Sequence, residues 1–571
     1  MSARTLVTSA LPYANGPIHL GHLIGAYLPA DVYVRHLRMR GDDEVLFVCG
    51  TDEHGVAITL GAEKDGGGTD FQAYVDRWHD DIDTTFQRFG IDFDVFSGTS
   101  AERNPLHAPL ARAFYLRLRE NGFLVRKAED QWFCSGCQRF LADRYVSGTC
   151  PSCGADGCRG DECPACGTWV DVAEITQAVC GVCQASPDLR PAEHDYLDLP
   201  ALAEDRIAVW LAERGERGWK PNVVKFVEGM LGDLRPRPIT RDLPWGVPVP
   251  TADGQGDEAE NRVLYVWFDA PIGYVSATQE LLADRGEPAD AWEKWWKDED
   301  TRLVHFIGKD NIAFHALVFP SMLHGQGEGW VLPSEIPAME FYNLEGGKFS
   351  TSENRTIDLA DFLERHPVDT LRWTLLATAP ETADSEFTFA EFQRRVNDEL
   401  NDVIGNLASR VTKFVAKRFG GAWPDGPEDL PPEAADLLDA DPVGGAIRGF
   451  RFRRSTEALL EVARAGNRFF DAAEPWKVVK DDPAAAGQVM LSCGALLRTI
   501  AHHMAPMLPG SADRLLAMLG CEGALGPWEP AAHAPLHPLA GRALGDLGAN
   551  LFTKIDDDAI ALEQKRLAGA D

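Results

Sequence analysis

The apolar residues of this chain occur in short β-branched runs, most followed by a turn and then by apolar residues at helical spacing. Such runs predict buried strands that lead into helices, and four of them occupy residues 5–14, 43–55, 261–278 and 302–323. Because strand, turn and helix units alternate, we predict an α/β fold with a doubly wound parallel sheet. Its ligand crevice would lie at the carboxyl ends of the strands, where we place Asp52, Asp269 and Asp310.

Two histidines three residues apart stand where the first strand gives way to a helix. Asn15 and Gly16 punctuate the chain, so His19 and His22 fall on one face of the first helical turn. Unpaired N–H groups and the positive end of the helix dipole lie there, and Gly21 lets a planar or anionic ligand come close. This arrangement is typical of a phosphate site. Two ordinary histidines at a helix start are an equally good interpretation of so short a motif.

The cysteines indicate metal binding. Nine of the twelve lie between residues 134 and 183, and eight of these form four C-x-x-C pairs: Cys134/Cys137, Cys150/Cys153, Cys163/Cys166 and Cys180/Cys183. Eight thiolates fill two closed, structural four-cysteine zinc sites, whereas disulfides are the weaker interpretation for an intracellular chain. A single zinc with an empty second set stays open, so one site is the minimum. The spacing does not decide whether the pairs combine in sequence or nest, and it leaves Cys158 over.

Composition and charge narrow the class of protein. Of the 571 residues, 45% are hydrophobic and 25% are charged, which is typical of a globular chain with room for about three or four domains. No apolar run is long enough to cross a bilayer and no secretory signal is evident, so we expect a cytoplasmic protein without membrane contact. The formal net charge of −33 means that any nucleic acid must meet local basic patches.

A lysine loop follows the second half of the predicted sheet. In "YNLEGGKFSTSENR", residues 342–355, two glycines precede Lys348, and Ser350 and Thr351 follow it. A lysine among small hydroxylated residues on a flexible loop is suited to closing over phosphate charge that builds up in a transition state. Alone, this motif is a weak indication.

Six segments resemble, in the expected order across essentially the whole chain, the methionyl-tRNA synthetase family of class I aminoacyl-tRNA synthetases. They are "ALPYANGPIHLGH", "CGTDEHG", "YVWFDAPIGY", "FIGKD", "NLASR" and "NRFFDAAEPW", joined by "KFSTS". The resemblance implies a split Rossmann-type sheet with a zinc-knuckle insertion and a C-terminal all-α anticodon-binding helix bundle. We expect the catalytic halves at residues 1–117 and 241–330, the insertion at 118–240, a stem-contact region at 331–395, and the helical domain with its tail at 396–571.

The resemblance also implies the chemistry of the first step, in which ATP and L-methionine form methionyl-adenylate and pyrophosphate, with Mg²⁺ accompanying ATP. It assigns catalysis to His19, Gly21, His22 and Lys348. The ATP site would comprise the two histidines and the lysine together with Asn15, Gly16, Asp310, Ser350 and Thr351. One departure matters, because Thr351 stands where the family signature Lys-Met-Ser-Lys-Ser has its second lysine. The electrostatic clamp therefore rests on Lys348.

The methionine pocket follows residue by residue from the same resemblance. It comprises Leu11, Tyr13, Asp52, Trp267, Pro271, Tyr274 and His315. Asp52 would bind the ammonium group of the substrate, while His315 would lie near the sulfur. A thioether makes soft contacts with aromatic rings and its sulfur is a weak acceptor, so selection would rest mainly on shape.

The remaining functions concern zinc and tRNA. The inner set Cys150, Cys153, Cys163 and Cys166 matches the knuckle of one-zinc family members, which implies a second zinc at the outer set Cys134, Cys137, Cys180 and Cys183. Asn406, Arg410 and Trp476 would read the anticodon of tRNA(Met), initiator and elongator alike, since single-stranded bases stack on aromatic faces. We expect a monomer.

Two rival interpretations stay open. A class I synthetase for valine, isoleucine, leucine or cysteine would share the signatures. However, residues 118–240 leave no room for a large editing domain, and closed cysteine sets offer no open zinc position. A noncatalytic RNA-binding protein on a synthetase scaffold would keep the fold. Thr351 favours it, whereas the intact His19, His22 and Asp52 argue against it.

Overall fold

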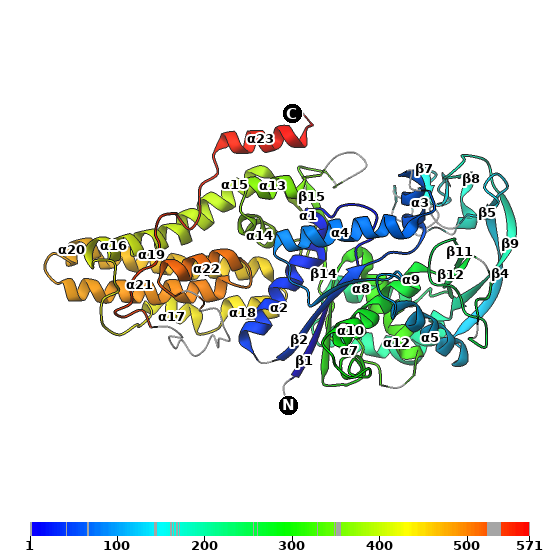
Figure 1. Ribbon diagram of the computed structural model, residues 1–571, viewed down its shortest axis with the longest axis horizontal. Helices are drawn as coiled ribbons and strands as arrows, with labels where there is room; N and C mark the ends of the chain where they lie inside the picture. The colour runs from blue at the N-terminus through cyan, green and yellow to red at the C-terminus, as the bar shows by residue number, and fades with distance from the viewer. Residues whose placement is uncertain are drawn as a thin grey trace.

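The fold is taken from a computed structural model of the chain (Figure 1). The residues that it describes are 3–41, 43–65, 68–141, 145–159, 163, 165–166, 170, 172–254, 256–259, 261–327, 329–347, 349, 356–521, 523 and 538–569. The molecule is elongated, with a helix bundle at one end, a small β-rich insertion at the other and a parallel sheet between them.

The central sheet has five parallel strands in the order β14-β13-β1-β2-β3. Their bounds are β1 Ala3–Ser9, β2 Asp43–Thr51, β3 Val95–Gly98, β13 Thr301–Gly308 and β14 Ala338–Met339. The chain winds outward from β1 through β2 to β3 and later returns to place β13 on the other side of β1. This reversal between β1 and β13 is the switch point where such sheets bind ligands, and it confirms the predicted fold class.

Both faces of the sheet are buried, as parallel sheets require. In β1, Val7 joins a core with helix α2, whereas its neighbour Leu6 joins a second core on the opposite face. In β2, Phe47 and Leu46 divide in the same way. The helices around the sheet are α1 Leu20–His22, α2 Leu28–Arg40, α3 Val56–Lys64, α4 Phe71–Phe89, α5 His107–Glu120, α10 Gly273–Asp284, α11 Glu293–Trp296 and α12 Phe319–Gly325. A π-helical turn, Leu23–Tyr27, joins α1 to α2.

The insertion is built on a long antiparallel pair. Strands β4 (Leu124–Cys134) and β9 (Asp188–Leu197) pair along their length, from Leu124 opposite Leu197 to Phe133 opposite Asp188. This ribbon carries Cys134 to its far end. Around it lie β5 Arg139–Phe140, β6 Val146–Thr149, β7 Asp156–Arg159, β8 Thr176–Cys180 and β10 Arg237–Pro238. Helices α6 Leu199–Leu202, α7 Ala208–Glu216 and α8 Pro221–Leu231 follow β9 and pack against the cores beside the central sheet.

One predicted strand is shorter than expected, and it belongs elsewhere. Strand β12 (Arg262–Leu264) pairs antiparallel with β11 (Thr240–Asp242), outside the parallel sheet. The chain then forms α9 (Val266–Asp269), so the placement of Asp269 at the end of a parallel strand was wrong. A continuous apolar run has no periodicity that separates a buried strand from a buried helix. Here Val266 and Phe268 are buried as part of that short helix.

The C-terminal part is helical. It begins with strand β15 Tyr342–Leu344, which pairs parallel with β16 Ser385–Phe387. Between these strands lie α13 Leu359–Arg365 and α14 Val368–Ala377. After β16 the helices are α15 Phe389–Arg394, α16 Asn406–Arg418, α17 Pro432–Leu438, α18 Pro442–Arg448, α19 Phe452–Ala473, α20 Pro475–Val478, α21 Pro483–Met504, α22 Pro509–Met518 and α23 Asp557–Leu567. A π-helical segment, Arg395–Gly405, makes α15 and α16 continuous. Helix α23 returns from the bundle and packs on α15 (Figure 1). Its Glu563 accepts hydrogen bonds from Arg365, the last residue of α13.

Helix α21 corrects the expectation that no segment could span a bilayer. It is long and apolar enough to do so, with a mean hydropathy of 1.3 over its most apolar window. However, 72% of that window is buried inside the bundle. A helix that is apolar on all sides is also what the centre of a bundle requires, so packing accounts for its composition.

A buried ion pair ties the sheet to the bundle. Arg372 on α14 and Asp31 on α2 are almost fully buried, with 2.6 Å between Nη2 and Oδ2. The same guanidinium donates to the carbonyl oxygens of Met507 (2.8 Å), Phe89 (3.3 Å) and Gly90 (3.2 Å). One side chain thus connects α2, the end of α4 and the segment between α21 and α22.

Replacing Arg372 with methionine should therefore destabilise the whole catalytic part. The substitution leaves the buried Asp31 with the Arg35 guanidinium and the backbone N–H of Asp92 as partners, and breaking a buried pair in this way costs about 3–5 kcal/mol. Urea unfolding followed by tryptophan fluorescence measures the change. Arg117→Met is the matched control, because its ion pair with Glu120 is exposed and should cost less than about 1 kcal/mol. Equal stability of the two variants would contradict the assigned role of Arg372.

Candidate functional site

The two signature histidines hold each other at the switch point of the sheet. His19 caps α1, and its backbone N–H donates to Nδ1 of His22 at 3.2 Å. The backbone N–H of His22 donates in return to Nδ1 of His19 at 3.4 Å. The two rings stack with centroids 3.7 Å apart. Because each Nδ1 accepts a backbone hydrogen bond, each imidazole is neutral and carries its proton on Nε2.

Burial and the neighbouring imidazole reinforce this neutral state. Desolvation, followed by the field of His22, lowers the pKa of His19 to about 2. The pair therefore offers two N–H donors without a net positive charge. An uncharged donor pair near physiological pH can bind phosphate oxygens without changing its own protonation state.

Gly21 has a different structural reason from the one that we predicted. A Cβ at this position would lie 3.0 Å from Cε1 of His19 and 3.3 Å from the carbonyl oxygen of Tyr342. The missing side chain therefore makes room for the His19 ring and for strand β15 in this structure. The sequence favoured close approach of a ligand, and the structure shows close approach of the His19 ring.

The second signature touches the first through one aromatic residue. Phe349 stacks on His19 with ring centroids 4.5 Å apart and an interplanar angle of 9°. Three parallel rings, those of His22, His19 and Phe349, thus stand in one stack. The predicted Lys348, Ser350 and Thr351 lie outside the described residues.

The predicted ligand groups for ATP otherwise lie around the same crevice. Asn15 and Gly16 follow β1 in the turn before α1, where the N–H of Asn15 donates to the carbonyl oxygen of Tyr13. Asp310 lies in a 3₁₀ turn, Lys309–Asn311, directly after β13. The structure therefore brings Asp310 and the His19 pair to the two strands that flank the switch point.

Asp52 is the buried carboxylate of the crevice. It follows β2 and forms a parallel bridge with Tyr13, in which its N–H donates to the carbonyl oxygen of Pro12 at 2.8 Å. Burial, followed by repulsion from Asp269, raises the pKa of Asp52 well above its ordinary value. The backbone N–H of His54 at 3.4 Å is the hydrogen bond recorded for its Oδ1. Such a carboxylate is poised to receive a cationic group.

An aromatic wall lies beside Asp52. The rings of Trp267 and Phe314 stack at 3.9 Å, and Tyr13 meets Trp267 edge-on at 6.3 Å. Tyr274 is hydrogen bonded to Nε2 of His315 at 2.8 Å. Because Nδ1 of His315 donates to the carbonyl oxygen of Asn311, the Tyr274 hydroxyl is the donor to this ring.

The other predicted pocket residues join this wall. The buried Pro271 lies in the turn before α10, and Leu11 packs where a Cβ on Gly273 would lie 3.1 Å from its Cδ1. Phe314 was missed by the sequence reasoning, although its place beside His315 in an apolar helix was a usable signal. His54, His107 and Asp269 form a further buried cluster that the sequence reasoning did not bring together.

The eight paired cysteines fall into two nested groups of thiols. The outer group is Cys134, Cys137, Cys180 and Cys183, and the inner group is Cys150, Cys153, Cys163 and Cys166. The Sγ–Sγ distances are 3.4 Å for Cys134–Cys183, 3.8 Å for Cys137–Cys180 and 3.7 Å for Cys153–Cys163. Tetrahedral zinc with Zn–S bonds of about 2.3 Å places its sulfurs about 3.8 Å apart, so both groups fit zinc and leave no position for a substrate.

The predicted anticodon residues lie together near the far end of the bundle. Arg410 on α16 forms an ion pair with Asp471 and lies over the ring of Phe470 at 4.4 Å. Phe470 in turn packs against Trp476 with centroids 5.9 Å apart. Trp476 is 38% exposed, and Asn406 is exposed one turn before Arg410. This is an open aromatic and cationic face rather than a plugged core.

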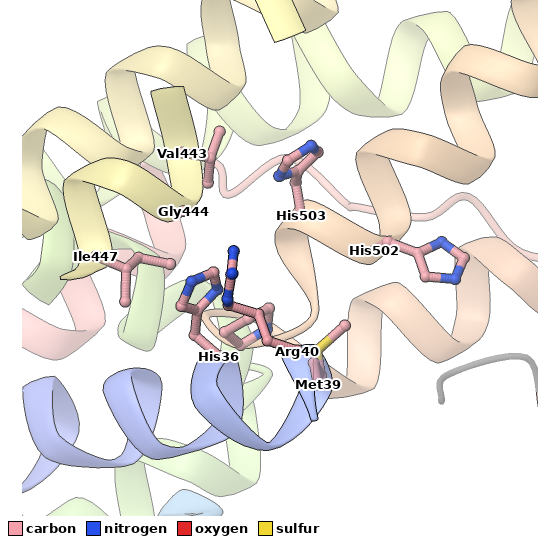
Figure 2. A pocket seen from close by; sticks show the side chains of 9 residues that line it. His36, Met39, Arg40, Val443, Gly444, Ile447, His502 and His503 are labelled. Atoms are coloured by element: carbon pink, nitrogen blue, oxygen red, sulfur yellow. The ribbon is translucent and has the colours of Figure 1, made fainter. Parts of the chain in front are cut away.

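A small cavity lies elsewhere, between the sheet and the bundle. Helix α2 lines it with His36, Met39 and Arg40, α18 with Val443, Gly444 and Ile447, and α21 with His502 and His503 (Figure 2). Nε2 of His36 is 3.1 Å from Nη1 of Arg448, which also pairs with Asp441. The cavity marks the contact between two parts of the molecule and is separate from the crevice.

Comparisons with known proteins show the family of the chain. A family model described as "tRNA synthetases class I (M)" matches residues 5–412, so the chain is a class I synthetase. A second model, "Anticodon binding domain of methionyl tRNA ligase", matches residues 441–571. The chain therefore belongs to the methionyl-tRNA synthetase family.

Full-length relatives carry the same name. The methionine-tRNA ligase of Rubrobacter xylanophilus is 43% identical over 100% of this chain and 98% of its own length. That of Chlorobaculum tepidum is 42% identical over 99% of this chain and 81% of its own. The solved methionyl-tRNA synthetase of Mycobacterium tuberculosis, in complex with methionyl-adenylate, shares the fold with a TM-score of 0.75 at 23% identity. That match covers 96% of this chain and 99% of the other.

Zinc analysis tests the nested grouping of the cysteines. Replacing Cys134 and Cys180 with serine should remove one zinc equivalent per chain and leave the other, because only the outer group loses thiolates. Inductively coupled plasma mass spectrometry on purified protein measures the metal content. Replacing Cys158 with serine is the control and should remove none. Loss of both equivalents, or of neither, from the outer variant would contradict two independent sites.

Proposed function

We propose that this chain is a methionine-tRNA ligase that works through the residues of the described crevice. One observation carries this proposal: the neutral His19–His22 donor pair and the buried Asp52 carboxylate both lie at the switch point of the sheet. A backbone bridge between Tyr13 and Asp52 holds the segment before the histidines against the end of β2. Donors for phosphate and a carboxylate for an ammonium group are what activation of an amino acid by ATP requires. The full-length identity to methionine-tRNA ligases supports the choice of amino acid.

In the first step, a carboxylate oxygen of methionine attacks the α-phosphorus of ATP. The bond from that phosphorus to the bridging oxygen of the β-phosphate breaks, and pyrophosphate leaves. The Nε2–H groups of His19 and His22 donate to phosphate oxygens as negative charge builds up, while Lys348 neutralises the departing pyrophosphate. Asp310 binds the ribose, and Asn15, Gly16, Ser350 and Thr351 complete the ATP site. Mg²⁺ bound with ATP supplies further charge compensation.

Methionine is held at both of its ends. Asp52 receives its ammonium group, which relieves the unfavourable burial that raises the pKa of this carboxyl. Trp267, Tyr274 and His315, with Leu11, Tyr13 and Pro271, enclose the thioether. Because the Tyr274 hydroxyl donates to His315, the sulfur meets an aromatic, weakly polar wall that suits its own weak acceptor strength.

In the second step, the 2′-hydroxyl of the terminal adenosine of tRNA attacks the carbonyl carbon of the adenylate, and AMP leaves. We propose that Asn406, Arg410 and Trp476 read the anticodon of both initiator and elongator tRNA(Met). The exposed ring of Trp476 beside Arg410 and Asn406 supports this, because unstacked bases need an exposed aromatic ring and nearby hydrogen-bonding groups. Zinc at the two cysteine groups would hold the insertion rigid. We expect the enzyme to act as a monomer in the cytoplasm.

ATP–pyrophosphate exchange without tRNA tests the activation step. We expect exchange with methionine and none with leucine, isoleucine, valine or cysteine. Asp52→Asn should raise the KM for methionine at least about thirtyfold, since losing one partner of a buried charge pair costs about 2 kcal/mol or more. Asp80→Asn on the exposed surface of α4 is the matched control.

Each other result of that assay has a definite meaning. Exchange with a different amino acid would assign the chain to a sister enzyme of class I. No exchange in folded, zinc-loaded protein would favour a noncatalytic RNA-binding protein, with Thr351 as the first residue to restore to lysine.

The binding of methionine should weaken as the pH falls. Burial and Asp269 raise the pKa of Asp52, so in acid this carboxyl takes up a proton while the methionine ammonium keeps its charge. The KM for methionine should rise by up to about tenfold per pH unit below that pKa. The KM for ATP should change less, since the lowered pKa of His19 keeps this ring neutral. Initial rates between pH 6 and 8.5 measure both, and a flat methionine profile would contradict the prediction.

A further inference from the structure

Three buried residues beside the methionine pocket have no part in the mechanism so far. His54 follows Asp52 in the turn after β2, His107 begins α5, and Asp269 ends α9. All three side chains are at least 95% buried, and their nitrogen and oxygen atoms lie within 4.8 Å of one another. Burying two histidines and a carboxylate so close together costs free energy unless the groups form hydrogen bonds with one another. Their burial therefore has to be explained by the contacts that they make.

Hydrogen bonds order the cluster. Nδ1 of His54 lies 2.6 Å from Oδ2 of Asp269 and donates to it. Nδ1 of His107 lies 3.0 Å from Oγ of Ser276, whose own hydroxyl donates to the carbonyl oxygen of Gly273. The His107 Nδ1 is therefore the donor to Ser276, and its Nε2 faces Oδ2 of Asp269 at 3.7 Å.

The carboxylate of Asp269 carries charge in this buried place. Burial opposes its ionisation, yet His54, which donates to Oδ2, and the nearby His107 together lower the pKa of Asp269. Among the described residues, Nε2 of His107 and Oδ1 of Asp269 have no hydrogen-bond partner. The other charged groups that face the cluster are Asp52 and Glu53, both acidic. The cluster is thus a site of concentrated negative charge, balanced by imidazole.

A proton suits this site better than a metal ion. The 2.6 Å between His54 and Asp269 is a hydrogen-bond distance, shorter than the separation of two ligands around one metal ion. A dication here would also stand next to Asp52 and repel the ammonium group that Asp52 receives. The observations therefore favour a hydrogen-bonded brace.

The brace reaches Asp52 through the backbone of His54. The N–H of His54 donates to Oδ1 of Asp52 at 3.4 Å, so the imidazole that holds Asp269 also fixes this donor. Gly55 keeps the turn tight, because a Cβ there, at φ +90°, would lie 2.9 Å from the side chain of Val266 on α9. On the other side, Ser276 lies on α10 two residues after Tyr274 of the pocket wall.

We propose that His107 and Asp269 are positioning residues for methionine, which hold His54 and thereby the Asp52 carboxylate in the orientation that receives the substrate ammonium. Neither residue touches the substrate. The proposal rests on the proposed function and extends it to residues from α5 and α9. It predicts that the cluster governs the ammonium end of methionine and leaves ATP and the thioether pocket alone.

Two substitutions of His107 separate positioning from packing. The amide nitrogen of glutamine takes the place of Nε2, which faces Asp269, whereas that of asparagine takes the place of Nδ1, which donates to Ser276. His107→Asn withdraws the ring nitrogen that faces Asp269 at 3.7 Å, and Asp269→Asn removes the charge that His54 is bonded to. Both should raise the KM for methionine about tenfold, with the KM for ATP within about twofold. His107→Gln should stay within about threefold of the wild type. His194→Asn is the control, because this buried histidine bonds Thr240 in the insertion.

A substrate analogue locates the defect. 4-(Methylthio)butanoate keeps the thioether and carboxylate of methionine and lacks the ammonium group. Its inhibition constant in the exchange assay should be the same for the wild type, His107→Asn and Asp269→Asn. Equal weakening of methionine and of this analogue would overturn the proposal, because the cluster would then shape the pocket as a whole.

Further outcomes are equally decisive. Unchanged methionine KM in both asparagine variants would overturn the proposal, as would a third zinc equivalent that His107→Gln removes. Where His107→Asn does not fold, Asp269→Asn gives the same comparison, and where Asp269→Asn does not fold, His107→Asn does. Wild-type exchange with methionine is measured first, so a failure of the proposed function is recognised before any variant is compared.

Discussion

The buried ion pair between Arg372 and Asp31 is the constraint on which the arrangement of the molecule depends. A guanidinium and a carboxylate lose their hydration when they are buried, so they are tolerated only where each hydrogen-bonding group finds a partner. Arg372 meets this condition with Asp31 and with carbonyl oxygens from two other segments. Because Asp31 lies on the helix that begins at the signature histidines, the bundle is fixed relative to the crevice.

The crevice contains an uncharged pair of hydrogen-bond donors and, apart from it, a buried carboxyl. At the start of this helix, mutual capping keeps His19 and His22 neutral with their Nε2–H groups free to donate. At the end of the neighbouring strand β2, Asp52 is a buried carboxyl whose charged form would be stabilised by a bound cation. Donors without charge suit the crowded phosphates of ATP, and a carboxylate suits an ammonium group. In the proposed function, the neutral histidines would bind phosphate and the buried carboxylate would bind ammonium, after two neighbouring strands.

Much of this was readable from the chain. Periodicity placed β1, β2 and β13, because β-branched runs bounded by turns have few other solutions in a protein of this size. The C-x-x-C pairs predicted two groups of thiols, because the spacing of zinc ligands within one knuckle can be read directly from neighbouring residues. Leu400, Ile404, Leu407 and Val411 recur at helical spacing in the sequence, and all four are buried on one side of the helix that the structure shows. The strand predicted up to Asp269 failed, because a short apolar run reads alike as strand or helix.

The sequence by itself determined the fold class, the positions of the signature residues along the chain and the family to which the chain belongs. Each of these depends on local spacing, which is preserved in a linear string. Tertiary structure alone decided that the cysteine pairs nest and that Gly21 makes room for His19. It also decided that Phe349 stacks on that ring and that His54, His107 and Asp269 meet beside Asp52. These depend on contacts between residues up to 330 positions apart, and long-range packing leaves no periodic signal in a single sequence.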